Sequence, residues 1–176
     1  NYLNQKKNLD SLYNRFPTIE NFAKQITEKQ ASFNNTHRKV LVSVLENQYQ
    51  HLSTSDVTKQ NIISLSSLDT FTVTTGHQLN IFTGPLYFLY KIISTINLTK
   101  ELKVKYPEYN FVPIYWMATE DHDFEEINYF TFKGKKFRWN KETSGPVGRL
   151  STEGLKDVFD IFSKENAAVL QKSYTQ

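Results

Sequence analysis

The sequence predicts an α/β fold, with a Rossmann-like parallel βαβ core (a partial sheet) preceded by N-terminal helices and followed by a β-hairpin. Three observations support this prediction. Residues 70–75 are β-branched and aromatic and are bounded by turn residues, which is typical of a strand. Residues 111–118 are continuously apolar, which is typical of a strand covered on both faces. Between them a helical pattern reaches Lys105, so a right-handed crossover joins two parallel strands.

Helical periodicity dominates the first part of the chain. Apolar residues recur at helical spacing in three segments, residues 18–32, 37–51 and 55–65. Thr18 is placed to cap the first of these helices, and Ser53 or Ser55 to cap the third. We expect residues 1–67 to form a helical segment that packs on the sheet. Residues 68–176 should form the first part of a truncated Rossmann-like core domain.

The crossover helix is expected to begin after Gly84. Pro85 suits the first helical position, because its φ is preset and it has no amide hydrogen to leave unpaired. A wide apolar face follows, made of Leu86, Leu89, Tyr90, Ile93 and Ile96. Lys91 is a polar exception to this pattern. It can snorkel to solvent, which is the commoner case, or reach an anionic ligand.

The last third of the sequence changes character. Residues 127–132 and 135–139 alternate in polarity across a two-residue turn, which predicts the hairpin. A loop rich in glycine follows at residues 145–149, and a helix is expected around residues 155–162.

The composition excludes several classes of chemistry. The chain has no cysteine, so it supplies neither a disulfide nor a thiol nucleophile. Its net charge is +3, but acids and bases are interspersed, so neither nucleic acid nor a membrane surface is specially implied as a partner. No apolar run approaches the ~18 residues of a membrane span. We therefore expect a cytoplasmic protein that acts on small molecules.

Polar residues follow both predicted strands. Thr75, Gly76, His77 and Gln78 come at the end of the first strand, and residues 119–123 come at the end of the second. In open α/β folds the carboxyl ends of parallel strands share one edge of the sheet, and ligands bind there. We therefore expect the two clusters to face one crevice.

The first cluster resembles an anion-binding loop. Gly76 would permit a sharp turn, and His77 and Gln78 can donate hydrogen bonds to a phosphate or a carboxylate. The helix that begins at Pro85 would add its free amides and positive dipole. The loop is neither a Walker loop nor a dinucleotide fingerprint. The alternative is an ordinary strand-to-helix connection, although nine residues are longer than is usual for one.

The second cluster is acidic. Glu120, Asp121 and Asp123 could bind Mg²⁺, accept hydrogen bonds from a ribose or an ammonium group, or act as a base. His122 could shuttle a proton near neutral pH. The spacing matches no zinc motif, so no metal is assigned. The alternative is an acidic cap on the short helix that follows.

These patterns define the candidate site. The candidate catalytic residues are His77, Asp121, His122 and Asp123. The candidate substrate- or nucleotide-binding residues are Thr75, Gly76, Gln78, Gly84, Lys91, Glu120 and Arg149. Arg149, in the glycine-rich loop, could bind a phosphate or form a structural ion pair.

Two blocks of sequence together resemble the bacillithiol biosynthesis cysteine-adding enzymes (BshC). These blocks are residues 74–91, from Thr-Thr-Gly-His-Gln to Tyr-Lys, and residues 112–127, which contain Thr-Glu-Asp-His-Asp. Residues 13–17 and 145–149 are similar to the family as well. The resemblance covers the whole chain, but family members are much longer, so the chain resembles their N-terminal part. His77 stands where the family usually has glutamine, and it makes the loop similar to the histidine-containing ATP loop of nucleotidyltransferases.

The resemblance implies a ligase that couples cysteine to the amino group of glucosaminyl-malate, activated by ATP, with Mg²⁺, or by another donor. It implies phosphate stabilisation by the first cluster and by the helix at Pro85, proton transfer by Asp121, His122 or Asp123, and a bond from Glu120 to the ammonium of cysteine. A homo-oligomer could form through a coiled coil beyond this chain, which alone would be inactive. Two alternatives stay open: a nucleotidyltransferase acting on a sugar or cofactor, and a non-catalytic nucleotide-binding module.

Overall fold

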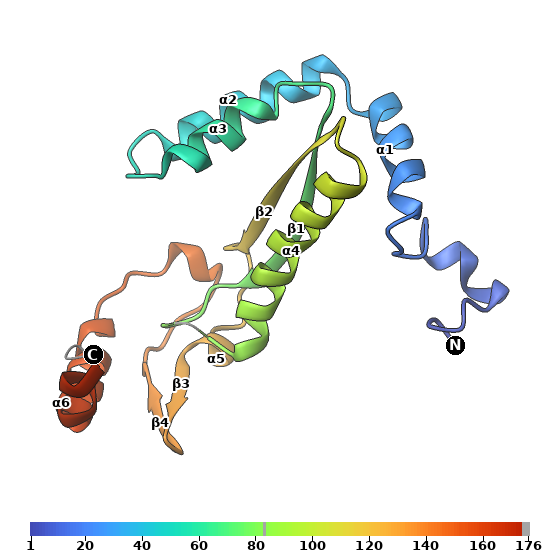
Figure 1. Cartoon of the computed structure of the whole chain (residues 1–176). Helices are drawn as coiled ribbons and strands as arrows, with labels where there is room; N and C mark the ends of the chain where they lie inside the picture. The colour runs from blue at the N-terminus through green and yellow to red at the C-terminus, as the bar shows by residue number, and fades with distance from the viewer. Residues whose placement is uncertain (83, 174–176) are drawn as a thin grey trace. The chain divides into compact units, whose positions relative to one another are not determined.

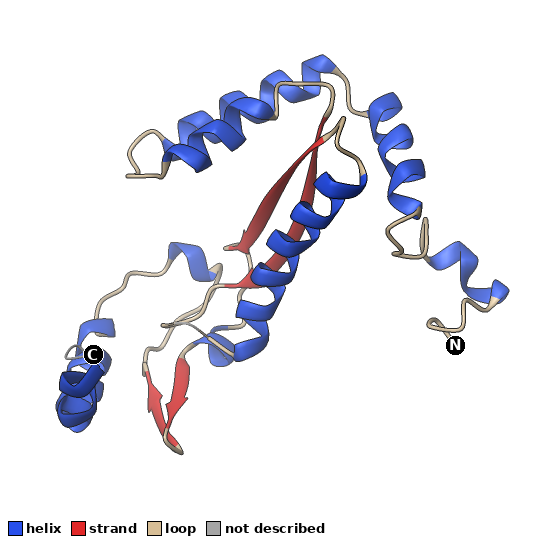
Figure 2. Cartoon of the chain, viewed as in Figure 1, coloured by secondary structure: helices blue, strands red, loops and turns tan. Residues whose placement is uncertain are grey.

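The computed structural model describes residues 1–82 and 84–173. Helices and strands alternate through the middle of the chain (Figure 2). In chain order the elements are η1 (Lys7–Leu12), α1 (Asn21–Ser32), α2 (Asn35–Tyr49), α3 (Asp56–Ser64), β1 (Thr70–Gln78), α4 (Leu86–Lys105), β2 (Asn110–Ala118), α5 (Phe124–Ile127), β3 (Tyr129–Phe132), β4 (Lys135–Arg138), η2 (Val147–Arg149) and α6 (Leu155–Ser173).

The predicted fold class is confirmed. β1 and β2 are parallel neighbours in a two-stranded sheet, and α4 connects them and runs beside them (Figure 1). β3 and β4 form the antiparallel hairpin, in which Tyr129 is opposite Arg138 and Phe132 is opposite Lys135. Within the described residues no helix is both long and apolar enough to cross a membrane.

The helix caps agree only in part with the prediction. Ser55 caps α3, because its side chain accepts a hydrogen bond from the amide of Thr58. Thr18 does not cap α1. The chain makes a turn there, the helix begins only at Asn21, and the Asn21 side chain donates to the carbonyl of Phe16 at 2.9 Å.

The face that α4 turns inward is not the one that the apolar pattern suggested. Its stripe of Leu86, Leu89, Tyr90, Ile93 and Ile96 is exposed. The buried side instead carries Leu102 and two threonines. Thr95 donates to the carbonyl of Lys91 at 2.9 Å, and Thr99 donates to that of Ile96 at 2.7 Å, so both hydroxyls are satisfied locally and can be buried.

The second strand is not covered along its whole length. Phe111 and Val112 are buried, as expected of its continuous apolar run. Trp116 is 59% exposed and Met117 is 50% exposed, so the expectation that both faces are covered is wrong at this end. The described part of the chain thus buries only the start of β2 and leaves side chains near its end open.

The chain divides into two compact units, and the division falls within β1, α4 and β2, so that each unit contains a part of these three elements. The first unit comprises residues 1–73 and 96–113, and the second comprises residues 74–95 and 114–176. The expected domain boundary after residue 67 stays a prediction.

In the first unit, α1 packs on the C-terminal half of α4 and on the first residues of β1 and β2. Ile26, Leu102 and Phe111 form the buried core of this unit. The hydroxyl of Tyr106 donates to the carbonyl of Ile19 at 2.7 Å, which fixes the chain just before α1.

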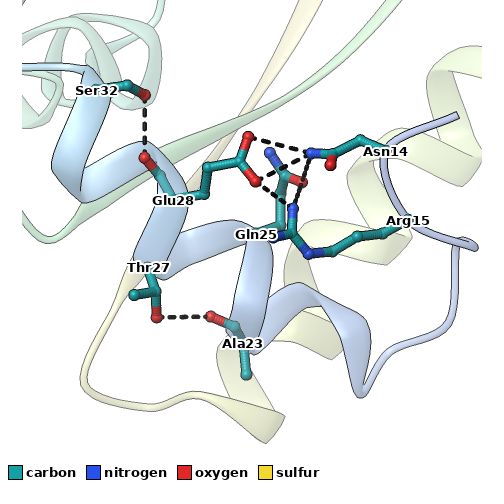
Figure 3. Close-up of polar contacts among 7 residues, drawn as sticks. All are labelled: Asn14, Arg15, Ala23, Gln25, Thr27, Glu28 and Ser32. Carbon is teal, nitrogen blue, oxygen red and sulfur yellow. Dashed lines mark hydrogen bonds and ion pairs between the residues drawn. The ribbon is translucent and has the colours of Figure 1, made fainter. Parts of the chain in front are cut away.

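A polar cluster holds the segment before α1 against that helix (Figure 3). Arg15 donates to Gln25 at 2.9 Å and pairs with Glu28, and Asn14 donates to both of these side chains. The hydrogen bond from Asn14, followed by that from Arg15, lowers the pKa of Glu28. Asn14 and Arg15, which belong to the family-like segment 13–17, therefore have a structural role: they fasten this segment to α1.

Arg38 is the most buried charge among the described residues, at 3% exposure. Its guanidinium donates to the carbonyl of Leu65 at 3.0 Å and to that of Thr70 at 2.9 Å. It also lies over the rings of Phe33 and Phe71, with 5.3 and 5.9 Å to their centroids. Arg38 thus ties α2 to the end of α3 and to the first residue of β1.

The second unit has a core of its own around the hairpin. Its buried residues are Ile81, Phe124, Ile127, Phe137, Trp139, Val147 and Val158. The indole of Trp139 donates to the carbonyl of Glu153 at 3.1 Å, which fastens the hairpin to the segment before α6.

Candidate functional site

Gln78 connects the ends of the two parallel strands. Its amide nitrogen donates to Oε2 of Glu126 at 3.1 Å, and its side chain is close enough to Asp121 to contribute to the lowered pKa of that carboxylate. One residue of the first polar cluster is therefore bonded to α5, which directly follows the second cluster. Because Gln78 is the last residue of β1, the strand itself positions this amide.

Gly76 does not form the expected turn, since β1 continues through Gly76 and His77 to Gln78. A Cβ built on Gly76 would lie 3.3 Å from Cβ of Trp116, so the glycine gives room to the neighbouring strand instead of to a loop. Lys91 donates to the carbonyl of Gly76, which uses its ammonium within the fold. Ligand binding by Gly76 or Lys91 stays a prediction.

His77 is 9% exposed, and both of its ring nitrogens have neighbours. Nε2 lies 2.6 Å from the hydroxyl of Tyr87, and Nδ1 lies 3.1 Å from the amide nitrogen of Asn80. That amide nitrogen also donates to the carbonyl of Gln78 at 3.0 Å. The His77 carbonyl accepts from the hydroxyl of Tyr115 at 3.1 Å. His77 is therefore a fixed group behind Tyr87 and not an exposed donor.

Gly84 is required by the arrangement of Asn80. It has a φ of +63°, and a Cβ built on it would lie 2.9 Å from both Cβ and Cγ of Asn80. Only glycine meets both conditions without strain. Gly84 therefore allows Asn80 to reach His77. Thr75 lies half-buried within β1.

Asp121 is the best-defined carboxylate of the second cluster. It accepts from the amide of Asp123 at 3.1 Å, and this bond lowers its pKa, with smaller contributions from the Gln78 side chain and from His122. A carboxyl with a lowered pKa stays ionised at neutral pH and is a weak base. Asp121 is therefore suited to orienting a substrate or a proton carrier.

The other members of the acidic cluster are exposed. Glu120 accepts from the indole of Trp116 at 3.3 Å. His122 and Asp123 lie in the connection to α5, and Asp123 makes no side-chain cap to that helix, so the alternative of an acidic cap is wrong for Asp123.

The glycine-rich loop at residues 145–149 is fastened to the end of β2. The amide of Val147 donates to the carbonyl of Asp121 at 2.7 Å, and the amide of Gly148 donates to that of Thr119 at 3.0 Å. A Cβ built on Gly148 would lie 2.5 Å from Cβ of Thr119, so only glycine permits this approach. Arg149 follows directly and is exposed at this end of the strand.

A pocket of about 580 Å³ lies beside Gln78. We call it the hairpin pocket, because one wall is strand β3 of the hairpin together with Phe162 of α6, and the other is the end of β1 with the first turn of α4. Its lining residues are His77, Gln78, Asn80, Phe82, Gly84, Pro85, Leu86, Tyr87, Glu126, Tyr129, Phe130, Thr131, Phe132 and Phe162. His77, Gln78 and Gly84 of the candidate site are thus brought together, whereas the acidic cluster adjoins the pocket through Gln78.

Sequence reasoning missed Asn80, Tyr87 and Glu126 in this pocket. Tyr87 had a usable signal, because it follows Pro85 by two residues and so lies in the first turn of the helix. Glu126 gave none, since it belongs to the single-turn helix α5. In the described part of the chain, no three His, Asp or Glu side chains are grouped closely enough to hold a metal ion.

Comparison with known proteins gives a consistent result. A family model described as "Bacillithiol biosynthesis BshC, N-terminal Rossmann-like domain" matches residues 1–175. Proteins named "Putative cysteine ligase BshC" are similar to the chain over nearly its whole length. One from Flavobacterium johnsoniae is 68% identical over 178 residues, which is 98% of this chain and 34% of that protein.

Two other relatives of the same name extend this range. One from Christiangramia forsetii is 62% identical and covers 98% of this chain and 34% of its own length. One from Bacillus cereus is 32% identical and covers 94% of this chain and 32% of its own length. The chain therefore spans about a third of the length of these relatives.

Proposed function

Because the chain belongs to the BshC family of bacillithiol biosynthesis and matches its N-terminal Rossmann-like domain, we propose that it serves a ligase that adds cysteine to the amino group of glucosaminyl-malate. The observation that carries this proposal is the match over residues 1–175. By the full-length protein we mean this chain together with the remainder that its relatives have.

The geometry at the strand ends supports a role in such a reaction. The amine that attacks cysteine must lose a proton as the amide bond forms. Asp121 is held ionised beside His122, and an ionised carboxylate can orient that imidazole or the incoming amine. The amide of Asp123 and the loop at residues 145–149 fix Asp121 from two sides. A preorganised carboxylate of this kind costs little reorganisation during the reaction.

ATP with Mg²⁺ is the activating co-substrate that the family resemblance suggests. The hairpin pocket does not fit a triphosphate, because its described lining residues include no lysine or arginine and the Gln78 amide is bonded to the carboxylate of Glu126. We therefore derive no step through a nucleotide at this pocket. We also propose that the full-length protein binds glucosaminyl-malate and is located in the cytoplasm. A homo-oligomer could form through the part of the relatives that this chain does not cover.

Replacing Asp121 with asparagine should lower the rate of cysteine addition by about 10²-fold or more, because the charge that orients the proton transfer is lost. The measurement is product formation by the full-length protein, followed by mass spectrometry with labelled cysteine, glucosaminyl-malate, ATP and Mg²⁺. Asp157→Asn, at an exposed carboxylate in the first turn of α6, is the matched control and should keep the wild-type rate. A wild-type rate in the Asp121→Asn variant would show that the reaction does not depend on this edge of the sheet.

A further inference from the structure

We propose that the hairpin pocket binds the protonated amine of an amino acid, with Glu126 as its counter-charge. Under the proposed function, on which this inference rests, that amino acid is cysteine. The sequence suggested Glu120 for this role. Glu120 does not line the pocket and instead accepts a hydrogen bond from Trp116. Glu126 lines the pocket and is held by Gln78.

The charge of the pocket selects the sign of its ligand. The described lining residues include one carboxylate, Glu126, and no lysine or arginine. Glu126 also forms no ion pair with any residue that the structure describes, unlike its neighbour Glu125, which pairs with Arg138. Glu126 is exposed, and the ammonium groups of Lys133 and Lys136 lie over the lining rings of Phe132 and Tyr129, at 5.7 and 3.5 Å from their centroids. The carboxylate, which has no ion-pair partner among the described residues, favours a cationic ligand group over a phosphate.

The hairpin wall of the pocket is aromatic. Phe130 and Phe132 each contact Phe162, at centroid distances of 5.2 and 5.3 Å, and Phe82 lies 4.6 Å from Phe130. Aromatic faces attract an ammonium group and also make favourable contacts with sulfur. This wall therefore suits a small ligand that carries both groups, as cysteine does.

The opposite wall supplies a polar group for the rest of the ligand. Tyr87 is 54% exposed, and its hydroxyl lies against Nε2 of His77. Nδ1 of His77 lies 3.1 Å from the Asn80 amide nitrogen and 3.0 Å from the Gln78 carbonyl. In the tautomer whose Nδ1 accepts from Asn80, the ring proton is on Nε2 and is donated to Tyr87. The hydroxyl hydrogen of Tyr87 is then available to the carboxylate of an amino acid in the pocket. Glu126 and Tyr87 would thus receive the two ends of a zwitterion.

Titration calorimetry of the full-length protein with L-cysteine tests this proposal. N-acetyl-L-cysteine lacks the ammonium group and should bind roughly tenfold or more weakly, because a charged hydrogen bond is lost. L-serine lacks the sulfur and should also bind more weakly. Glu126→Gln should weaken cysteine binding by a similar factor of about ten or more. The control is Glu125→Gln, a change of the adjacent glutamate, which faces Arg138 and should leave cysteine binding unchanged.

Several results would overturn the proposal: no cysteine binding by the wild type, equal binding of N-acetyl-L-cysteine, or unchanged binding in Glu126→Gln. The ligand comparison uses the wild-type protein, so it holds even if a variant folds poorly. Product formation by a Glu126→Gln variant with unchanged cysteine affinity would refute the pocket but not the ligase. If the wild type bound cysteine in a Glu126-dependent way but formed no product, the pocket would be supported and the proposed ligase refuted.

Discussion

Replacing Arg38 with alanine is expected to destabilise the first unit by about 2–4 kcal/mol, because two buried carbonyls lose their hydrogen-bond donor and a cavity opens between two aromatic rings. The measurement is amide hydrogen exchange of α2, α3 and the start of β1 in the full-length protein, which reports the free energy of local opening.

Two further variants separate the causes of that loss. Arg38→Lys keeps the positive charge but lacks the planar guanidinium that lies over the rings of Phe33 and Phe71, so it should recover only part of the stability. Lys39→Ala removes an exposed charge from the adjacent position and should change stability by no more than about 0.5 kcal/mol. If Arg38→Ala exchanged no faster than Lys39→Ala, Arg38 would not be the structural link between α2, α3 and β1.

Replacing Gly148 with alanine should lower the rate of cysteine addition by about 10²-fold, since small displacements of a positioned group have effects of this size. The added methyl group would collide with Thr119, including its backbone oxygen, so the loop must move away. The bonds from Val147 to Asp121 and from Gly148 to Thr119 would then break. The measurements are product formation and amide exchange at Val147 and Gly148.

Gly145→Ala is the matched control for this variant. Gly145 lies in the same loop and has a φ of +84°, but a Cβ built there would meet nothing within 4 Å. The Gly145→Ala substitution therefore introduces backbone strain but no collision with the end of β2. Gly148→Ala is expected to be clearly the more damaging change. Equal losses in the two variants would mean that strain in the loop, and not its contact with β2, controls the site.

The βαβ unit and the hairpin could be predicted because each depends on a local pattern. The first strand is β-branched, the second is continuously apolar, and the hairpin alternates. The inward face of α4 could not be predicted in this way. Apolar residues occur on both sides of this helix, and the buried threonines are satisfied by bonds inside the helix that periodicity does not reveal.

For the candidate site, the sequence could predict the place of the two polar clusters, whereas the roles of their residues stay predictions. Parallel topology alone placed the two polar clusters on one edge of the sheet. The sequence prediction ended the first strand at Thr75, because Gly76 suggested a turn. In the structure β1 continues to Gln78, and Gly76 makes room for Trp116. The hairpin pocket was missed because it depends on the tertiary position of β3 and β4, which brings Phe130 and Phe132 toward the first turn of α4.

The most direct test of the proposed ligase is the reaction of the purified full-length protein with labelled cysteine, glucosaminyl-malate, ATP and Mg²⁺. Mass spectrometry would follow the cysteine-containing product, and a separate assay would follow release of pyrophosphate. We expect cysteine to be added to the amino group of glucosaminyl-malate. Pyrophosphate release without incorporation of cysteine would instead indicate a nucleotidyltransferase, and nucleotide binding with no turnover would indicate a non-catalytic module. Either result would contradict the proposed ligase.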